Sequence, residues 1–160
     1  MMAATHVLAG MAAWSGVAWL DGGLARPDAL AIAALGSLLP DIDHPKSWMG
    51  RRVRPVSLLI SKIFGHRGIT HSLLAVGGCL FALLIIGKGA FAPAVLVGYL
   101  SHLLCDSLTK SGVPLLWPWR RPFGLRLLRT GGKVESFLAV LMAVATGLPW
   151  AAYLYPRLLH

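Results

Sequence analysis

The residues of this chain that could do chemistry are gathered in five short patches, each at the end of an apolar segment. The patches hold five of the six histidines and four of the six acidic residues. They are His6, the sequence PDIDH with Asp41, Asp43 and His44, the sequence HRGITH with His66 and His71, the sequence HLLCD with His102 and Asp106, and Glu135 in KVES. Ionisable groups at membrane depth are costly and usually functional. Imidazoles and carboxylates together suit zinc, manganese or iron, so the patches predict a metal site.

The spacing within two patches supports this prediction. His102 and Asp106 lie four residues apart, which on a helix places both side chains on one face, about one turn apart. They would reach one metal ion or two adjacent ions, or else form a hydrogen-bonded pair. Asp41 and Asp43 are separated by a single residue, and two carboxylates this close repel each other unless a cation or a proton lies between them.

Three of these residues also have simpler interpretations. His6 alone would be a hydrogen-bonded interfacial residue, and His44 a solvated loop residue. Glu135 would be a first-turn acid favoured by the helix dipole. The full set holds more donors than one ion needs, which is compatible with a two-metal centre. The expected metal ligands are His6, Asp41, Asp43, His66, His71, His102, Asp106 and Glu135.

Two cations adjoin the ligand patches, since Arg67 follows His66 and Lys133 lies two residues before Glu135. A cation repels a metal ion but stabilises negative charge that develops in a transition state. We therefore expect Arg67 to stabilise an anionic substrate, and Asp43 or Glu135 to act as the base. The alternative is that both cations serve only to set the topology.

A helical membrane protein would explain how the patches meet. The chain has 160 residues, of which 56% are hydrophobic and 13% charged, and its mean hydropathy is +0.68. This composition predicts one all-α domain over residues 1–160, a polytopic membrane bundle of about five transmembrane helices. Thr70 is the expected N-cap of the third helix. The expected apolar runs are 4–20, 28–43, 70–87, 90–108 and 134–155.

The basic residues predict the orientation of this bundle. Of the 15 Lys and Arg residues, six lie within 44–68 and six within 109–133. Positive charge gathers in cytoplasmic loops, so both loops are expected inside, where they would also attract anionic headgroups. With five spans, all the patches then lie on the cytoplasmic side, and an error of one span would break the convergence. The loops carry no known nucleic-acid motif, so a nucleic-acid partner is not expected.

The second basic loop contains GVPLLWPWRRPFG at 112–124, with three prolines and two tryptophans. Such a stretch cannot form a regular helix, and indoles gather at headgroup level. We expect an irregular interfacial segment that is either an aromatic anchor or an entry for substrate from the bilayer.

Four stretches, in the same order along most of the chain, resemble the YdjM-like family of bacterial inner-membrane proteins. They are THVLAG at 5–10, GSLLPDIDHPKS at 36–47, HRGITHSLL at 66–74 and HLLCDSLTKSGVPLLWPW at 102–119. Members are described as metal-dependent hydrolases and as LexA-binding, so the resemblance implies a hydrolase of the inner membrane with a divalent metal. A weaker similarity is to the helical zinc phospholipase C and P1 nuclease group, which combines an aspartate, a later histidine and an HxxxD pair. This similarity implies that one ion is held by Asp41, His71, His102 and Asp106, leaving His6, His66 and Glu135 for a second.

These observations together predict a membrane-embedded, metal-dependent hydrolase that acts on a lipid or other amphiphile from the cytoplasmic leaflet, with zinc as the expected ion. A phosphoester is the expected bond because the surroundings are basic, and an amide or carboxylic ester is the alternative. A transporter or metal-permeation protein could use the same His/Asp cluster, but ligands gathered at one end argue against a conduction path. A third alternative is a non-catalytic membrane anchor whose basic loops bind a partner.

Overall fold

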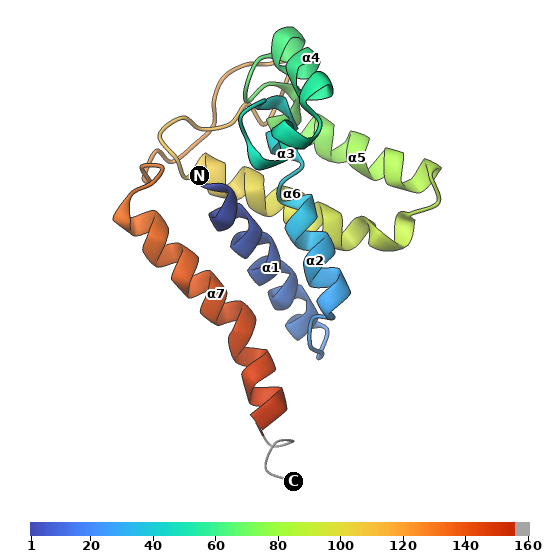
Figure 1. The fold of residues 1–160 in the computed structure, drawn as a ribbon, viewed down its shortest axis with the longest axis vertical. Helices are drawn as coiled ribbons and strands as arrows, with labels where there is room; N and C mark the ends of the chain where they lie inside the picture. The colour runs from blue at the N-terminus through green and yellow to red at the C-terminus, as the bar shows by residue number, and fades with distance from the viewer. Residues whose placement is uncertain (156–160) are drawn as a thin grey trace.

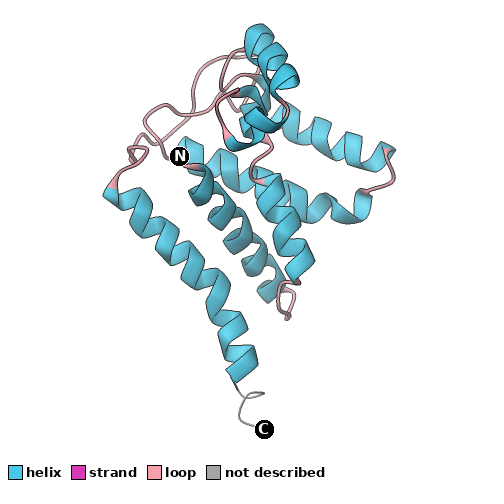
Figure 2. Ribbon diagram, in the orientation of Figure 1, coloured by secondary structure: helices cyan, strands magenta, loops and turns pink. Residues whose placement is uncertain are grey.

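Residues 1–155 are described by a computed structural model, with the exception of the side chain of Leu154, and they form an all-helical protein (Figure 1). Figure 2 shows helices joined by loops, and no strand occurs in these residues, so the all-α prediction is confirmed. The predicted domain of 1–160 extends past them, since residues 156–160 lie outside the described part. The α-helices are α1 (Ala3–Leu20), α2 (Pro27–Gly36), α3 (Trp48–Arg52), α4 (Arg54–Phe64), α5 (Leu73–Ile85), α6 (Ala92–Ser107) and α7 (Lys133–Leu154), and the 3₁₀-helices are Pro40–Asp43, Ile69–His71 and Gly89–Phe91.

Each of the five predicted apolar runs contains a helix, namely α1, α2, α5, α6 and α7. Among residues 1–155, two helical stretches are long and apolar enough to cross a membrane, Gly89–Ser107 and Lys133–Tyr153. The second run is interrupted, because α2 ends at Gly36 and the 3₁₀-helix from Pro40 follows it. The bundle of five full spans is therefore not confirmed, and the number of spans stays a prediction. In Figure 1, the axes of α1, α2 and α7 are similarly inclined, with α2 running opposite to the other two, whereas α5 and α6 form a hairpin that lies across them.

The N-cap of α5 is Ser72 and not Thr70. Ser72 has extended backbone dihedrals, and its hydroxyl accepts a hydrogen bond from Ala75 N at 3.3 Å, as an N-cap residue does. Thr70 lies in the preceding 3₁₀-helix and donates its hydroxyl to Asp43 instead. Thr70 therefore lies beside Asp43, at the candidate site.

Small residues allow α1, α2 and α6 to approach closely. A Cβ added at Gly98 of α6 would meet the carbonyl oxygen of Ala33, and one at Gly36 of α2 would meet the backbone of Val95. A Cβ at Gly10 of α1 would lie 2.9 Å from that same oxygen of Ala33. Close approach at small residues is typical of helices that pack in a membrane.

This crossing positions two of the ligand patches. His6 lies one helical turn before Gly10, and His102 lies one turn after Gly98. The two histidines therefore lie on neighbouring helices, at the same end of the crossing, and their rings face each other there.

The segment between α6 and α7 is irregular, as its prolines and tryptophans predicted. It contains only two isolated β-bridges in place of regular structure, Thr109 with Leu128 and Val113 with Phe123. It lies at the same end of the molecule as α3 and α4 in Figure 1. That end also holds the start of α1 and the end of α2, where the ligand patches are.

Candidate metal centre

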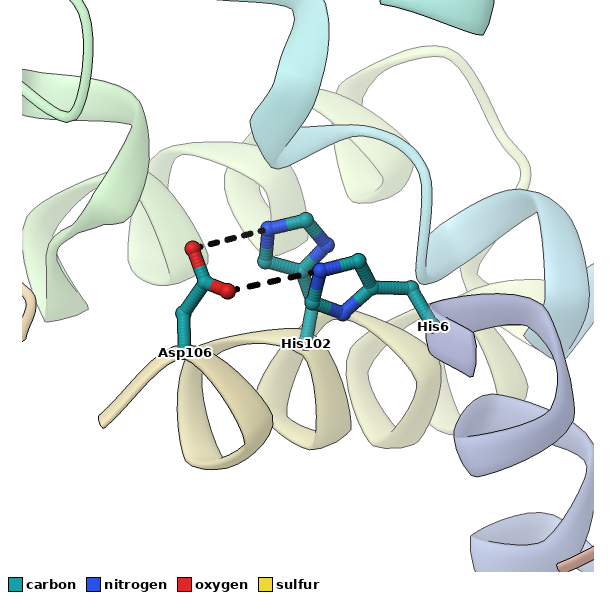
Figure 3. Close-up of side chains that lie close together, drawn as sticks. All are labelled: His6, His102 and Asp106. Carbon is teal, nitrogen blue, oxygen red and sulfur yellow. Dashed lines mark ion pairs between the residues drawn. The ribbon is translucent and has the colours of Figure 1, made fainter. Parts of the chain in front are cut away.

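Five of the eight predicted ligands meet in two overlapping groups. One group is His6 from α1 with His102 and Asp106 from α6, and the other is Asp41, His71 and His102. In each group, one ligand atom per residue lies within 4.8 Å of the others. Figure 3 shows the first group, in which the carboxylate of Asp106 faces both imidazoles. The two groups share His102, so they form one cluster of three imidazoles and two carboxylates.

The Asp106 carboxylate is the point on which the first group converges. Its Oδ1 lies 3.4 Å from His6 Nε2, and its Oδ2 lies 3.9 Å from His102 Nε2 and 3.8 Å from His71 Nε2. The rings of His6 and His102 are stacked, with centroids 3.7 Å apart. Asp106 also pairs with two cations, the ammonium group of Met1 and the guanidinium of Arg67, each at 2.7 Å.

The hydrogen bonds at the back of the rings determine which nitrogens are free. His102 Nδ1 donates to the carbonyl oxygen of Ser37 at 2.6 Å, and His71 Nδ1 lies 3.2 Å from Asp43 Oδ2. A partner at Nδ1 fixes the tautomer in which Nε2 carries a lone pair, as in histidines that ligate metals. The two Nε2 atoms lie 3.3 Å apart, and His102 Nε2 lies 4.0 Å from Asp41 Oδ1.

This arrangement fits a cation. Two imidazole lone pairs that face each other at 3.3 Å repel unless a proton or a metal ion lies between them. His6, His71, His102 and Asp106 are buried, and Asp41 is partly buried, so water cannot solvate most of these donors. Nitrogen and oxygen donors without cysteine suit zinc, manganese or iron. The residues of the cluster could therefore hold a divalent ion.

Asp43 belongs to neither group and lies directly behind the histidines. Its Oδ1 lies 3.1 Å from His66 Nδ1, and its Oδ2 accepts hydrogen bonds from Arg67 N at 2.9 Å and from the Thr70 hydroxyl at 2.5 Å. Burial acts to raise the pKa of Asp43, but the hydrogen bonds from His66, His71 and Thr70 hold that pKa well below its ordinary value. Asp43 is thus a buried, ionised carboxylate that orients two histidines.

The other two predicted ligands, His66 and Glu135, also lie outside the groups. Glu135 is in the first turn of α7, and its carboxylate accepts hydrogen bonds from Met2 N at 2.6 Å and Gly131 N at 2.7 Å. These two hydrogen bonds to Glu135 connect the start of α1 to the start of α7. The side chain of His66 is 43% exposed and borders the cluster from the loop before the 3₁₀-helix Ile69–His71. His44 lies beside His66, with ring centroids 4.5 Å apart.

Arg67 connects the cluster with its surroundings. Its backbone is in the left-handed region, with φ of 58°, and its side chain is mostly buried. One guanidinium nitrogen, Nη2, contacts Asp106, and the other, Nη1, donates to Gly112 O at 3.2 Å. Lys133, the other predicted cation of the site, is the first residue of α7 and forms no ion pair within the described residues.

A cavity of about 480 Å³ opens beside the cluster. Its lining includes Asp41 and Asp106 of the cluster, together with His66 and Arg67. The remaining lining is Met1, Ala3, His44, Lys46, Ser47, Trp48, Arg51 and Thr130. The two carboxylates of the cluster therefore border a cavity that is also lined by the basic residues Lys46, Arg51 and Arg67.

Sequence reasoning missed several groups of the site. The carbonyl of Ser37 carries no residue-specific signal, because every residue has one. The hydroxyl of Thr70 was present in HRGITH but was assigned to a helix cap. Lys46 and Arg51 were counted with the topological charges, and only the cavity relates them to the cluster.

Comparison with known proteins gives consistent matches. The family described as "YdjM inner membrane protein" matches residues 1–158. The inner membrane protein YdjM of Escherichia coli (strain K12) is 48% identical over 120 residues, which are 70% of this chain and 61% of that protein. YvsG of Bacillus subtilis (strain 168) is 32% identical over 149 residues, which are 91% of this chain and 92% of that protein. The chain thus spans about three fifths of the length of the YdjM relative, and no solved structure matches.

Proposed function

The chain belongs to the YdjM inner membrane protein family, and on this premise we propose that it is an integral membrane, metal-dependent hydrolase. Its substrate would be a lipid-like molecule reached from the cytoplasmic side of the inner membrane. One observation carries the proposal. A cluster of three buried histidines, the buried Asp106 and the partly buried Asp41, which could hold a cation, borders a cavity lined by Lys46, Arg51 and Arg67.

The metal would be held by His6, His71, His102, Asp41 and Asp106. We propose zinc as the ion, and the site would hold one or two ions. Manganese and iron suit the same donors. A divalent ion at such a site supplies a Lewis acid that polarises a phosphoryl oxygen and acidifies a water molecule. Asp43 would keep His71 in the tautomer that exposes Nε2, from 3.2 Å.

His66 is the residue best placed to move a proton. It lines the cavity, and its Nδ1 lies 3.1 Å from Asp43 Oδ1. In this arrangement a carboxylate orients a catalytic imidazole. Asp43 and Glu135, the bases expected from the sequence, already use their oxygens for other hydrogen bonds. We therefore propose His66 as the base, with Asp43 as its positioning residue.

The charge of the cavity favours an anionic substrate. Lys46, Arg51 and Arg67 would bind a phosphate group, and Arg67 could stabilise the charge that develops on its oxygens. A phosphoester is therefore proposed over an amide or a carboxylic ester. A transporter using the same cluster is a weaker proposal, because the ligands gather at one end of the helices that carry them.

The test is metal analysis and hydrolysis assays on one detergent-purified preparation. The wild type is expected to contain one or two equivalents of metal and to cleave a lipid phosphoester. His66→Gln should keep the metal and lose about 10²–10⁴ in rate, the usual contribution of a general base. His44→Gln is the comparison variant, because the His44 ring lines the same cavity beside His66 but forms no ion pair with the Asp43 carboxylate within the described residues. A wild type that binds no metal on titration, or that cleaves no phosphoester, ester or amide lipid, would refute the proposal.

A further inference from the structure

Helix α4 buries a serine against the protein and leaves three apolar side chains exposed along one side. Ser57 is fully buried, whereas Val56, Leu59 and Ile63 are 49%, 59% and 58% exposed. An amphipathic helix on a water-soluble surface does the opposite and buries its apolar side. About half or more of each of these three side chains is left uncovered by residues 1–155.

The charges around this apolar side are all of one sign. Arg51, Arg54 and Lys62 are exposed and form no ion pair within the described residues. The sequence contains no acidic residue between Asp43 and Asp106 that could neutralise them. A helix with an apolar stripe, whose charged residues and those of the preceding turn are all Lys and Arg, matches the boundary between anionic headgroups and acyl chains. A second copy of the chain fits less well, because a symmetric contact would bring like charges together.

The length and place of α4 agree with a position in the plane of the interface. Its 11 residues span about 16 Å, which is too short to cross a hydrocarbon core of about 30 Å. Figure 1 shows it at the end of the molecule where α2 ends, next to α3. It packs against the 3₁₀-helix Pro40–Asp43, which carries Asp41 and Asp43.

The preceding helix connects α4 to the metal centre. The Ser47 hydroxyl, which caps α3, donates to the carbonyl oxygen of Asp41 at 2.8 Å. Gly50 of α3 packs so tightly on the carbonyl of His44 that no Cβ would fit there. Trp48 and Arg51 of α3 line the cavity, so a surface that holds α4 also fixes one wall of the entrance.

We infer that α4 lies in the headgroup region of an anionic phospholipid leaflet, with Val56, Leu59 and Ile63 inserted. This position brings the mouth of the cavity to headgroup level, where a lipid can enter sideways without leaving the membrane. The insertion itself requires only that the protein is in a membrane. Its role as a substrate entrance rests on the proposed hydrolase function.

The test is a fluorescent label on either side of α4, in the full chain reconstituted into lipid nanodiscs. Ile63→Cys and Arg54→Cys are nine residues apart, which is half a turn around the helix axis. Both are made in a Cys79→Ala, Cys105→Ala background and labelled with an environment-sensitive dye. We expect spin-labelled lipids to quench the dye at 63 and aqueous iodide to leave it unquenched, with the reverse at 54. Removing phosphatidylglycerol from the nanodiscs should reduce the lipid quenching at 63.

Iodide quenching at 63 equal to that at 54 would overturn the inference. Protection at 63 from both quenchers, together with dimers on light scattering, would assign the surface to a second copy and overturn it too. Lipid quenching that does not change without phosphatidylglycerol would overturn the choice of an anionic leaflet. The assay needs neither metal nor substrate, so an inserted α4 in a protein without hydrolase activity would refute the proposed function alone.

Discussion

Replacement of Asp43 by Asn would test whether this carboxylate supports the metal ligands without being one. In the structure Asp43 contacts four groups, His66 Nδ1, His71 Nδ1, Arg67 N and the Thr70 hydroxyl. Asparagine keeps the size and one acceptor oxygen but removes the charge and one acceptor. Loss of a group that orients a metal-ligating histidine typically lowers metal affinity 10–100-fold, or about 1.4–2.7 kcal/mol. We expect a loss in that range for Asp43→Asn.

The assay is zinc competition against a chelator of known affinity, on folded protein in detergent. His102→Ala is the reference for a lost ligand, because His102 belongs to both groups, and it should release most of the metal. Asp28→Asn is the matched control, since Asp28 is exposed and, among the described residues, forms an ion pair with Arg26 alone, far from the cluster along the chain. If Asp43→Asn releases metal as completely as His102→Ala, Asp43 is itself a ligand. If its affinity equals that of the wild type, the contacts to the histidines do not support the site.

Three further predictions use other parts of the chain. Arg67→Gln should keep most of the metal but lower turnover of an anionic substrate about 10²–10³-fold, from the loss of one contact to developing charge; unchanged turnover in the same preparation would leave Arg67 as a structural partner of Asp106. Gly98→Val should lower the thermal unfolding midpoint and the metal content together, because a Cβ at this position meets the Ala33 carbonyl. Cysteine at Lys62 should be labelled by an impermeant thiol reagent from the cytoplasmic side only, in inverted vesicles compared with intact cells. Labelling in intact cells would reverse the orientation.

The helical architecture could be predicted from hydropathy because each apolar run does contain a helix. The number of spans could not, since α2 has 10 residues and α5 has 13. A run of apolar residues predicts a buried or membrane segment, but it does not show where an α-helix ends and a 3₁₀-helix begins. Helix α4 was overlooked for a related reason. Its leucines and isoleucines are interspersed with Arg and Lys, so the segment was interpreted as a basic loop.

The separate roles of Asp41 and Asp43 could not be predicted either, although both stand in PDIDH. The sequence indicates two neighbouring carboxylates, and a local charge argument treats them alike. In the structure they lie in a 3₁₀-helix, where residues two apart point about 240° around the axis from each other. Asp41 therefore faces His102, while Asp43 turns toward His66, His71 and Thr70. The conformation of this single turn therefore makes Asp41 a candidate ligand and Asp43 a residue that orients the ligating histidine.

The location of the cluster favours a metal site over a structural hydrogen-bond network. A structural hydrogen-bonded pair would need only His102 and Asp106. The helices α1, α2 and α6 already pack closely at glycines, so the crossing does not need the other polar residues. His6 adds a third buried ring, whose Nδ1 has no hydrogen-bond partner within the described residues. Buried polar groups without full partners cost stability, and natural proteins accept that cost chiefly at functional sites. A cation shared by the converging Nε2 atoms and the Asp106 carboxylate would offset a different cost, the repulsion between these acceptors, because it turns them into ligands of one charge.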